Sequence, residues 1–214
     1  QRVLALANKE QRGYITPQEF NLFANQVQLE IFEQYFYDIN QYNRTAGNET
    51  EFSDMVELVE EKIDIFRKGA TLAIGTSGNG VLPLNLHKLG SVFFGTTEVD
   101  KVSARDAAYI NGSSLANPGL INRYVYSLTG LLSGQRRIQV YPAQTTTLTI
   151  NYIKIPPPVA WGWTVIGEKA MYDPSTTKTF NFELHASEET ELVYRILTLA
   201  GIAIKRQEVA QAGS

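Results

Sequence analysis

Apolar residues in the first part of the chain recur with the period of an α-helix. Between residues 15 and 39, one stripe at helical spacing comprises Phe20, Phe23, Ala24, Val27, Ile31 and Tyr35. A second stripe lies nearly opposite and comprises Leu22, Leu29, Phe32 and Phe36. An ordinary surface helix needs only one apolar stripe to face the core. The second stripe must therefore be covered by more of the same chain or by another copy of it.

The ends of this helix and of its successor carry recognisable signals. Thr16 and Glu19 form a capping box around Pro17, which sits where a missing N–H costs nothing. After a polar turn, a second apolar period predicts a helix that Gly69 ends, with residues Phe52, Val56, Val59, Ile63 and Phe66. Residues 1–69 are therefore predicted to form an antiparallel helical hairpin, which covers one stripe of the first helix.

Residues 70–185 change to short β-like runs separated by Gly, Asn, Pro and Ser. The clearest strand is Thr147 to Ile155, where apolar and polar residues alternate so that one face is apolar. Three prolines end it and predict a stiff arm that carries Trp161 and Trp163. A further short strand is expected at FNFEL, from residue 180.

Residues 186–214 are predicted to form a third helix and a polar tail. Apolar residues at helical spacing would face the helical part, namely Leu192, Ile196, Leu199, Ala200 and Ala203. The predicted fold class is α+β, with a helical hairpin, a central β-rich insertion and a C-terminal helix that packs back on the hairpin.

Composition narrows the function classes. The chain has 19 Lys plus Arg, 22 Asp plus Glu and no Cys. With a net charge of -3, the chain lacks the overall positive charge that favours binding to nucleic acid. The absence of Cys excludes disulfides and cysteine-ligated metals. No apolar run approaches the roughly 20 residues of a membrane span, so no membrane partner is expected.

Motifs for catalysis or cofactors are weak. GTSGNG at residues 75–80 lacks the Lys that a phosphate-binding loop requires, and His87 and His185 each stand alone. A carboxylate pair such as Asp173 and Glu183 can be drawn in any chain with this many acids. We expect no enzymatic activity, no cofactor and no metal. Trp161 and Trp163 would serve either as a sugar-stacking platform or as anchors of a protein interface.

The order of these elements resembles that of a known family. A hairpin beginning NKEQRGYITPQEFNLFANQVQLEIFEQYF, a strand ending TLTINYIKIPPPVAWGW and a final FELHASEETELVYRILTLAGIAIKRQEVAQ are similar to the head-to-tail adaptor, or neck-ring, proteins of tailed bacteriophages. Short-tailed and crAss-like phages have such proteins beneath the portal. The resemblance spans nearly the whole chain. It rests on the order of the elements and on the general character of these three stretches, because the family has no catalytic signature.

The resemblance implies a structural virion protein that joins the portal to the tail and lines the DNA channel. Such proteins form homo-oligomeric rings, commonly of twelve copies, and contact the portal protein, an adjacent tail or neck protein and, passively, the DNA. The virion neck is the implied location, after assembly in the bacterial cytoplasm. The segment expected to reach a partner contains Ile202, Ile204, Lys205 and Arg206.

In a closed ring each subunit offers two different faces to its neighbours. We therefore expect Leu22, Leu29, Phe32 and Phe36 to form the intersubunit stripe, and Phe32→Asp to block assembly while leaving the monomer folded. The alternatives are a carbohydrate- or receptor-binding tail module and a small tail-associated hydrolase.

Overall fold

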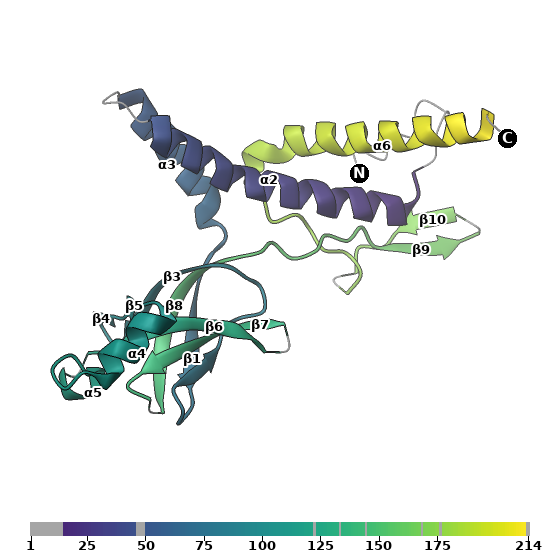
Figure 1. The fold of residues 1–214 in the computed structure, drawn as a ribbon. Coiled ribbons are helices and arrows are strands. Elements are labelled where there is room, and N and C mark those ends of the chain that lie inside the picture. The colour runs from purple at the N-terminus through teal and green to yellow at the C-terminus, as the bar shows by residue number, and fades with distance from the viewer. Residues whose placement is uncertain are drawn as a thin grey trace. The chain divides into compact units, whose positions relative to one another are not determined.

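A computed structural model describes residues 15–45, 50–121, 123–132, 134–143, 145–167, 169–175 and 177–212 (Figure 1). The fold is α+β, as predicted, with a long N-terminal helix, several sheets and a C-terminal helix. It divides into two compact units. Gln1–Ile65 with Pro156–Ser214 form the first, here the helical unit, and Phe66–Ile155 form the second, here the β unit. Residues 156–185, expected within the β-rich region 70–185, are thus grouped with the helices.

The helical unit is built on one long helix. Its helices are α2 (Pro17–Thr45), α3 (Thr50–Asp64), the 3-10 turn η1 (Ala186–Glu188) and α6 (Glu189–Ala212). Both α3 and α6 pack against α2. The predicted capping box starts α2, because Glu19 N donates to Thr16 Oγ1 at 3.2 Å and Thr16 N donates to Glu19 Oε2 at 2.9 Å.

Burial along α2 corrects one predicted contact. The first apolar stripe is in the core, with Phe20, Ala24, Val27, Ile31 and Tyr35 all buried. In the second stripe Leu22 is 65% exposed, whereas Phe32 is only 1% exposed. Phe32 therefore belongs to the subunit's own core, where its ring meets that of Phe36 edge-on at 5.1 Å, and is not available to a neighbouring copy. The expectation that Phe32→Asp would spare the monomer is wrong, because the charge would be buried in this core.

A partly buried ion pair joins α3 to η1, the turn directly before α6. Lys62 Nζ lies 2.5 Å from Glu188 Oε1, and Glu188 is 5% exposed. The ammonium group also lies 5.7 Å from the centre of the Tyr35 ring on α2. Burial, and then the Glu188 charge, raise the pKa of Tyr35, so its hydroxyl stays protonated. Three helices meet at this pair, and loss of Lys62 would leave the buried Glu188 carboxylate without its partner.

The β unit contains two four-stranded sheets around one core. The first sheet has the order β1-β8-β3-β4 and the second β2-β7-β6-β5. Their strands are β1 (Arg67–Ile74), β2 (Asn79–Val81), β3 (Leu86–Phe94), β4 (Thr97–Glu98), β5 (Asp100–Lys101), β6 (Val125–Leu132), β7 (Gln135–Tyr141) and β8 (Thr146–Lys154). Leu148 and Ile150 of β8 share this core with Ile138 and Val140 of β7. Strand β8 keeps the predicted alternation, with Leu148 and Ile150 buried and Thr147 and Thr149 exposed.

Several predicted elements differ from the structure. Gly69 was expected to end a helix, but it lies in β1, which pairs antiparallel with β8 over its whole length. The pairing with β8 overrides the local helix-stop signal. FNFEL forms no strand and contributes one isolated bridge, between Ala160 and Phe180. The helices α4 (Ala104–Gly112) and α5 (Pro118–Ile121) were not predicted, although Ser103 caps α4.

None of the helices, as far as the structure describes them, is long and apolar enough to cross a membrane.

The two stripes of α2 should differ in stability measurements. Phe32→Ala is expected to lower the free energy of unfolding by about 3–5 kcal/mol, because it removes a fully buried ring. Leu22→Ala should change it by less than about 0.5 kcal/mol, because that side chain is largely exposed. Urea unfolding of the monomeric chain measures both. Equal effects would contradict the assignment of Phe32 to the subunit core.

Candidate interaction surfaces

The segment 156–162 lies along α2, which holds it through side-chain amides. Val159 N donates to Asn25 Oδ1 at 2.7 Å, and Asn25 Nδ2 donates back to the Val159 carbonyl at 2.8 Å. One turn earlier on the helix, Trp161 N donates to Asn21 Oδ1 at 2.7 Å, and Asn21 Nδ2 donates to the Trp161 carbonyl at 3.4 Å. These reciprocal pairs recur at every second residue, as in an antiparallel ladder. The helix amides thus take the place of a neighbouring strand.

Gln28, on the same side of α2, adds a third side-chain amide that binds this segment. Its Nε2 donates to the Pro157 carbonyl at 2.8 Å, and its Oε1 accepts from Glu183 N at 3.2 Å. Gln28 is 1% exposed, so these bonds satisfy a buried polar group. Asn21, Asn25 and Gln28 are here called the amide ladder. The stiff arm predicted after the three prolines is thus fixed along α2 by these bonds.

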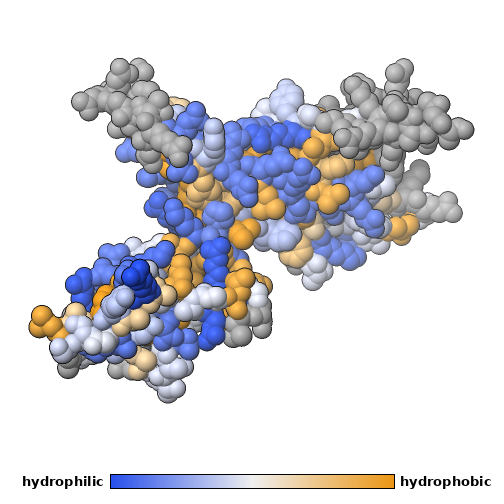
Figure 2. Space-filling view, viewed as in Figure 1, coloured by the Kyte–Doolittle hydropathy of each residue, from blue (hydrophilic) through white to orange (hydrophobic). Residues whose placement is uncertain are grey.

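Beyond the ladder the chain forms a two-stranded hairpin, β9 (Trp163–Ile166) and β10 (Lys169–Tyr172). Gly167, in its turn, has φ of +58°, a conformation that suits glycine. Side chains alternate between the two faces of a strand, so Val165 and Ile166 point to opposite sides. Val165 is 59% exposed, Ile166 61% and Met171 54%. The hairpin therefore presents apolar side chains on both faces, and Figure 2 shows apolar residues at this edge of the helical unit.

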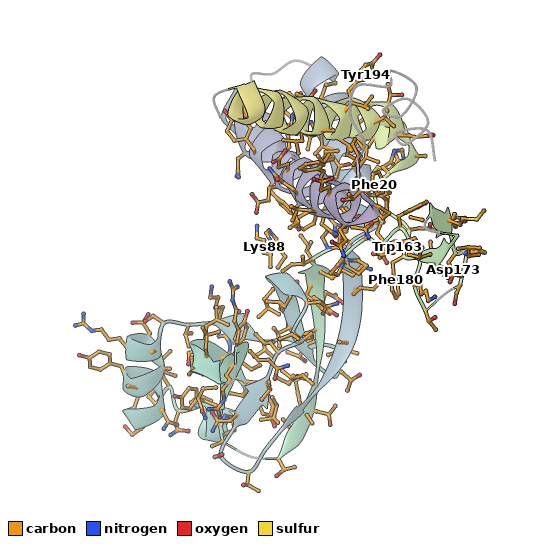
Figure 3. The ribbon with its side chains drawn as sticks, turned by 90° about the vertical axis from the view of Figure 1, so that its right-hand side faces the viewer. Phe20, Lys88, Trp163, Asp173, Phe180 and Tyr194 are labelled. Atoms are coloured by element: carbon orange, nitrogen blue, oxygen red, sulfur yellow. The ribbon has the colours of Figure 1, made fainter. Side chains whose placement is uncertain are left out.

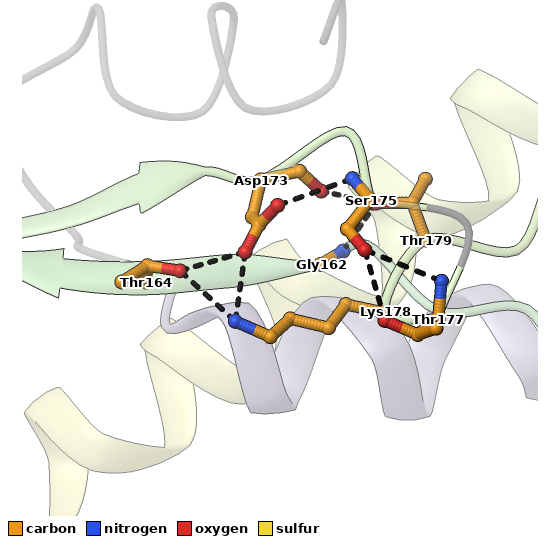
Figure 4. Close-up of polar contacts among 7 residues, drawn as sticks. All are labelled: Gly162, Thr164, Asp173, Ser175, Thr177, Lys178 and Thr179. Atoms are coloured by element: carbon orange, nitrogen blue, oxygen red, sulfur yellow. Dashed lines mark hydrogen bonds and ion pairs between the residues drawn. The ribbon is translucent and has the colours of Figure 1, made fainter.

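A polar network holds the base of the hairpin (Figure 4). Lys178 Nζ lies 2.7 Å from Asp173 Oδ2, which also accepts from Thr164 Oγ1 of β9 at 2.8 Å. Ser175 N donates to Asp173 Oδ1 at 3.1 Å. These bonds, with that from Lys178 the strongest, lower the pKa of Asp173 to about 2. Asp173 is therefore ionised over the physiological range and ties β9 to the loop that follows β10.

Gly162 sits between this network and the amide ladder. Gly162 N donates to Thr179 Oγ1 at 3.2 Å, and its carbonyl accepts from Asp173 N at 2.9 Å. A Cβ at this position would lie 2.6 Å from Thr179 Oγ1 and 2.8 Å from the Asp173 carbonyl oxygen. The close fit leaves no space for a side chain, so the hairpin is connected tightly to the segment on α2.

An aromatic groove of about 270 Å³ lies beside the hairpin. Its lining includes Phe20, Trp161, Tyr172, Phe180 and Phe182. The rings of Trp161 and Tyr172 stack at 5.9 Å with an interplanar angle of 24°, so each covers one face of the other. The Trp161 indole N–H is buried and, among the described residues, has no hydrogen-bond partner. Figure 3 shows Trp163, Asp173 and Phe180 on the hairpin side of this unit, with Phe20 on α2.

The other predicted interface residues separate into three groups. Leu22 and Leu29 are 65% and 42% exposed, so this part of the second stripe is open to a partner. Phe36 is half-buried against Phe32. Trp163 is half-buried at the start of β9. The side chains of Ile202, Ile204, Lys205 and Arg206 lie outside the described part of the structure, which gives only the helical backbone there.

His185, one of the two histidines considered for metal binding, makes a structural contact. His185 Nδ1 accepts from Ser187 N at 3.3 Å and caps η1. Over the described ranges, no group of three or more His, Cys, Asp or Glu residues could hold a metal ion.

Sequence reasoning missed the hairpin and the ladder. The hairpin had a usable signal, because a two-residue Gly-Glu turn at 167 separates WTVI from KAMY, both rich in strand-forming residues. The ladder had a weaker signal. Asn21 and Asn25 are residues that disfavour a helix locally, and their spacing of four places both on one face of α2.

Removal of one ladder amide should destabilise the helical unit. Asn25→Ala leaves the buried Val159 N–H and carbonyl without partners, so we expect a loss of about 1–3 kcal/mol in the free energy of unfolding. Gln26→Ala, on the exposed side of the same helix, is the control and should change it by less than about 0.5 kcal/mol. Chemical denaturation measures both variants, and an unchanged Asn25→Ala protein would show that the ladder contributes nothing.

The Asp173 network should respond to acid. A carboxylate with a lowered pKa stabilises the folded state above its ordinary pKa of about 3.9 and loses this effect as the pH falls towards about 2. Lys178→Ala should therefore raise the pKa of Asp173 towards the ordinary value. Carboxyl carbon NMR titration measures it, with Lys101→Ala, at an exposed position of the β unit, as the control for loss of a lysine elsewhere. A pKa near 3.9 in the unmodified protein would contradict the network.

Comparison with models of known protein families gives no match. A search of curated protein sequences finds no match either. The functional interpretation therefore rests on the surfaces described above and on the resemblance in element order.

Proposed function

We propose that this chain is a structural subunit of a homo-oligomeric ring in the neck of a tailed bacteriophage. The ring would join the portal to the tail and line the DNA channel, with no catalytic activity and no cofactor of its own. The family resemblance suggests twelve copies, contacts with the portal protein and an adjacent tail or neck protein, passive contact with DNA, and a location in the virion.

The observation that carries the proposal is the hairpin. Val165, Ile166 and Met171 are each more than half exposed, on a two-stranded element with a fixed base. Isolated hairpins are marginally stable in water, and strands with unpaired edges invite pairing with another chain. An apolar hairpin whose base is held in place is thus suited to dock on a partner with little loss of conformational entropy.

A second exposed apolar area, on α2, is consistent with assembly into a ring. Leu22 and Leu29 lie on the outer side of α2 and are spaced by seven residues, which is two helical turns. A closed ring of identical subunits uses two different patches on each subunit, because each copy meets one neighbour on either side. The hairpin and this part of α2 supply two such patches within the helical unit.

The carbohydrate-binding alternative receives less support from the aromatic groove. A sugar platform requires exposed aromatic faces, whereas Trp161 and Tyr172 each use one face to cover the other. Glycan-array binding that is lost in Trp163→Ala, with assembly unaffected, would favour this alternative over the ring.

Assembly should depend on the apolar hairpin. The triple variant V165T/I166T/M171T keeps strand-forming residues but removes apolar surface, and we expect it to remain monomeric under conditions in which the unmodified chain assembles. The matched control is L84T/L115T/L131T, three leucines of the β unit that are 74%, 85% and 69% exposed. Mass photometry and negative-stain imaging, each with and without portal protein, distinguish monomers from rings.

Two results would count against the proposal. One is an unmodified chain that stays monomeric and ignores the portal protein. The other is a hairpin variant that assembles as well as the control, which would show that the ring forms through different surfaces.

A further inference from the structure

Charge is divided unevenly between the two units. The β unit has nine Lys plus Arg but three Asp plus Glu, which gives a net charge of +6. The helical unit has ten Lys plus Arg and nineteen Asp plus Glu, a net charge of -9. The overall charge of -3 conceals this separation. The β unit therefore has the positive charge that attracts polyanions, although the chain as a whole lacks it.

Three adjacent strands of the second sheet have no negative charge. The sequences of β2, β6 and β7 contain neither Asp nor Glu. The fourth strand of this sheet, β5, contributes Asp100, whose carboxylate forms an ion pair with Arg123. The carboxylate of Asp106 accepts from Ser103 Oγ at 2.6 Å, at the start of α4. Cationic residues on β2, β6 or β7 are therefore not balanced by acids of their own strands.

Arg136 and Arg137 lie next to each other on β7, in this part of the sheet. Successive side chains of a strand point to opposite faces, so the two guanidinium groups lie on the two faces of the sheet. Within the described ranges, neither guanidinium group takes part in a hydrogen bond or an ion pair. Arg137 is only partly exposed, and its Nε is buried. Burial without an acceptor is costly for a cation, so this site favours an anionic ligand.

The neighbours of Arg137 suit an oxyanion. Its partners in register are Thr129 of β6 and Val81 of β2, both exposed, and directly paired residues place their side chains on the same face. The Thr129 hydroxyl can therefore donate to a group that Arg137 binds. The register shifts after Thr129, and a Cβ at Gly130 would meet nothing within 4 Å. A phosphate group thus has space to accept from the guanidinium and the hydroxyl together.

We infer that Arg136 and Arg137, with Thr129 beside them, bind phosphate groups of the DNA backbone. The planar fork of arginine binds a phosphate through two parallel hydrogen bonds. Because the two side chains point to opposite faces, a flat acidic protein surface would meet only one of them, whereas a duplex offers phosphates along two strands. The inference rests on the proposed function and makes the β unit the part of the ring that touches DNA. Repetition around the ring adds up contacts that are weak in one copy and independent of base sequence.

DNA binding by the full chain tests the inference. Fluorescence anisotropy with a labelled duplex of about 20 base pairs, over a series of salt concentrations, gives the Kd and its salt dependence. R136Q/R137Q should bind about tenfold more weakly, and the slope of log Kd against log salt should fall by about two, because each lost phosphate contact releases about 0.9 counterion fewer. R136K/R137K keeps the charge but loses the fork, so its affinity should lie between the two. The matched control is K88Q/K101Q, which makes the same charge change at exposed residues of β3 and β5 and should weaken binding less than about threefold.

The inference is overturned if R136Q/R137Q binds the duplex as K88Q/K101Q does, because net charge rather than this site would then set the affinity. It is also overturned if R136Q/R137Q fails to assemble but binds DNA normally, which would assign the arginines to a contact between copies. Inorganic phosphate that shifts the NMR signal of the Arg137 side chain, in a chain that does not bind the duplex, would identify free phosphate as the ligand instead. Ring assembly is measured separately. A chain that binds DNA through these arginines but never assembles, with or without portal protein, refutes the proposed function and leaves the phosphate site standing.

Discussion

The architecture of the helical unit depends on a ladder of side-chain amides between α2 and a chain segment more than a hundred residues later. Pro156, Pro157 and Pro158 have no backbone N–H, so this segment cannot join a sheet as an ordinary strand. Asn25 and Gln28 use the carbonyls that remain and the N–H of Val159. An extended segment can therefore be buried against a helix without leaving its polar groups unsatisfied.

Several surfaces follow from this constraint. The ladder ends at Trp161, and the hairpin begins two residues later, so the position of the hairpin on the helical unit is set by α2. Asp173 then ties the start of β9 to the loop that follows β10, which fixes the base of the hairpin. Val165, Ile166 and Met171 of this anchored hairpin are exposed. Polar contacts thus hold in place an element that presents apolar surface to solvent.

Local signals in the sequence predicted the elements whose stability is local. The capping box at Thr16 and the alternation in β8 both depend on residues close in sequence, and both are confirmed. The ladder joins residues about 130 apart through side chains, and no periodicity reports such a pairing. The prediction for Phe32 was wrong for the same reason. Packing within the subunit covers Phe32, whereas Leu22 of the same stripe stays exposed.

Hydrogen exchange in the lone chain tests the central claim, that the ladder holds the hairpin segment before any partner binds. The backbone amides of Val159 and Trp161 donate to Asn25 and Asn21, so NMR should show them protected to the same degree as amides in the middle of α2. Exchange at the rate of an unstructured peptide at both positions would contradict the account, because the segment would then be free in the subunit and ordered only by assembly.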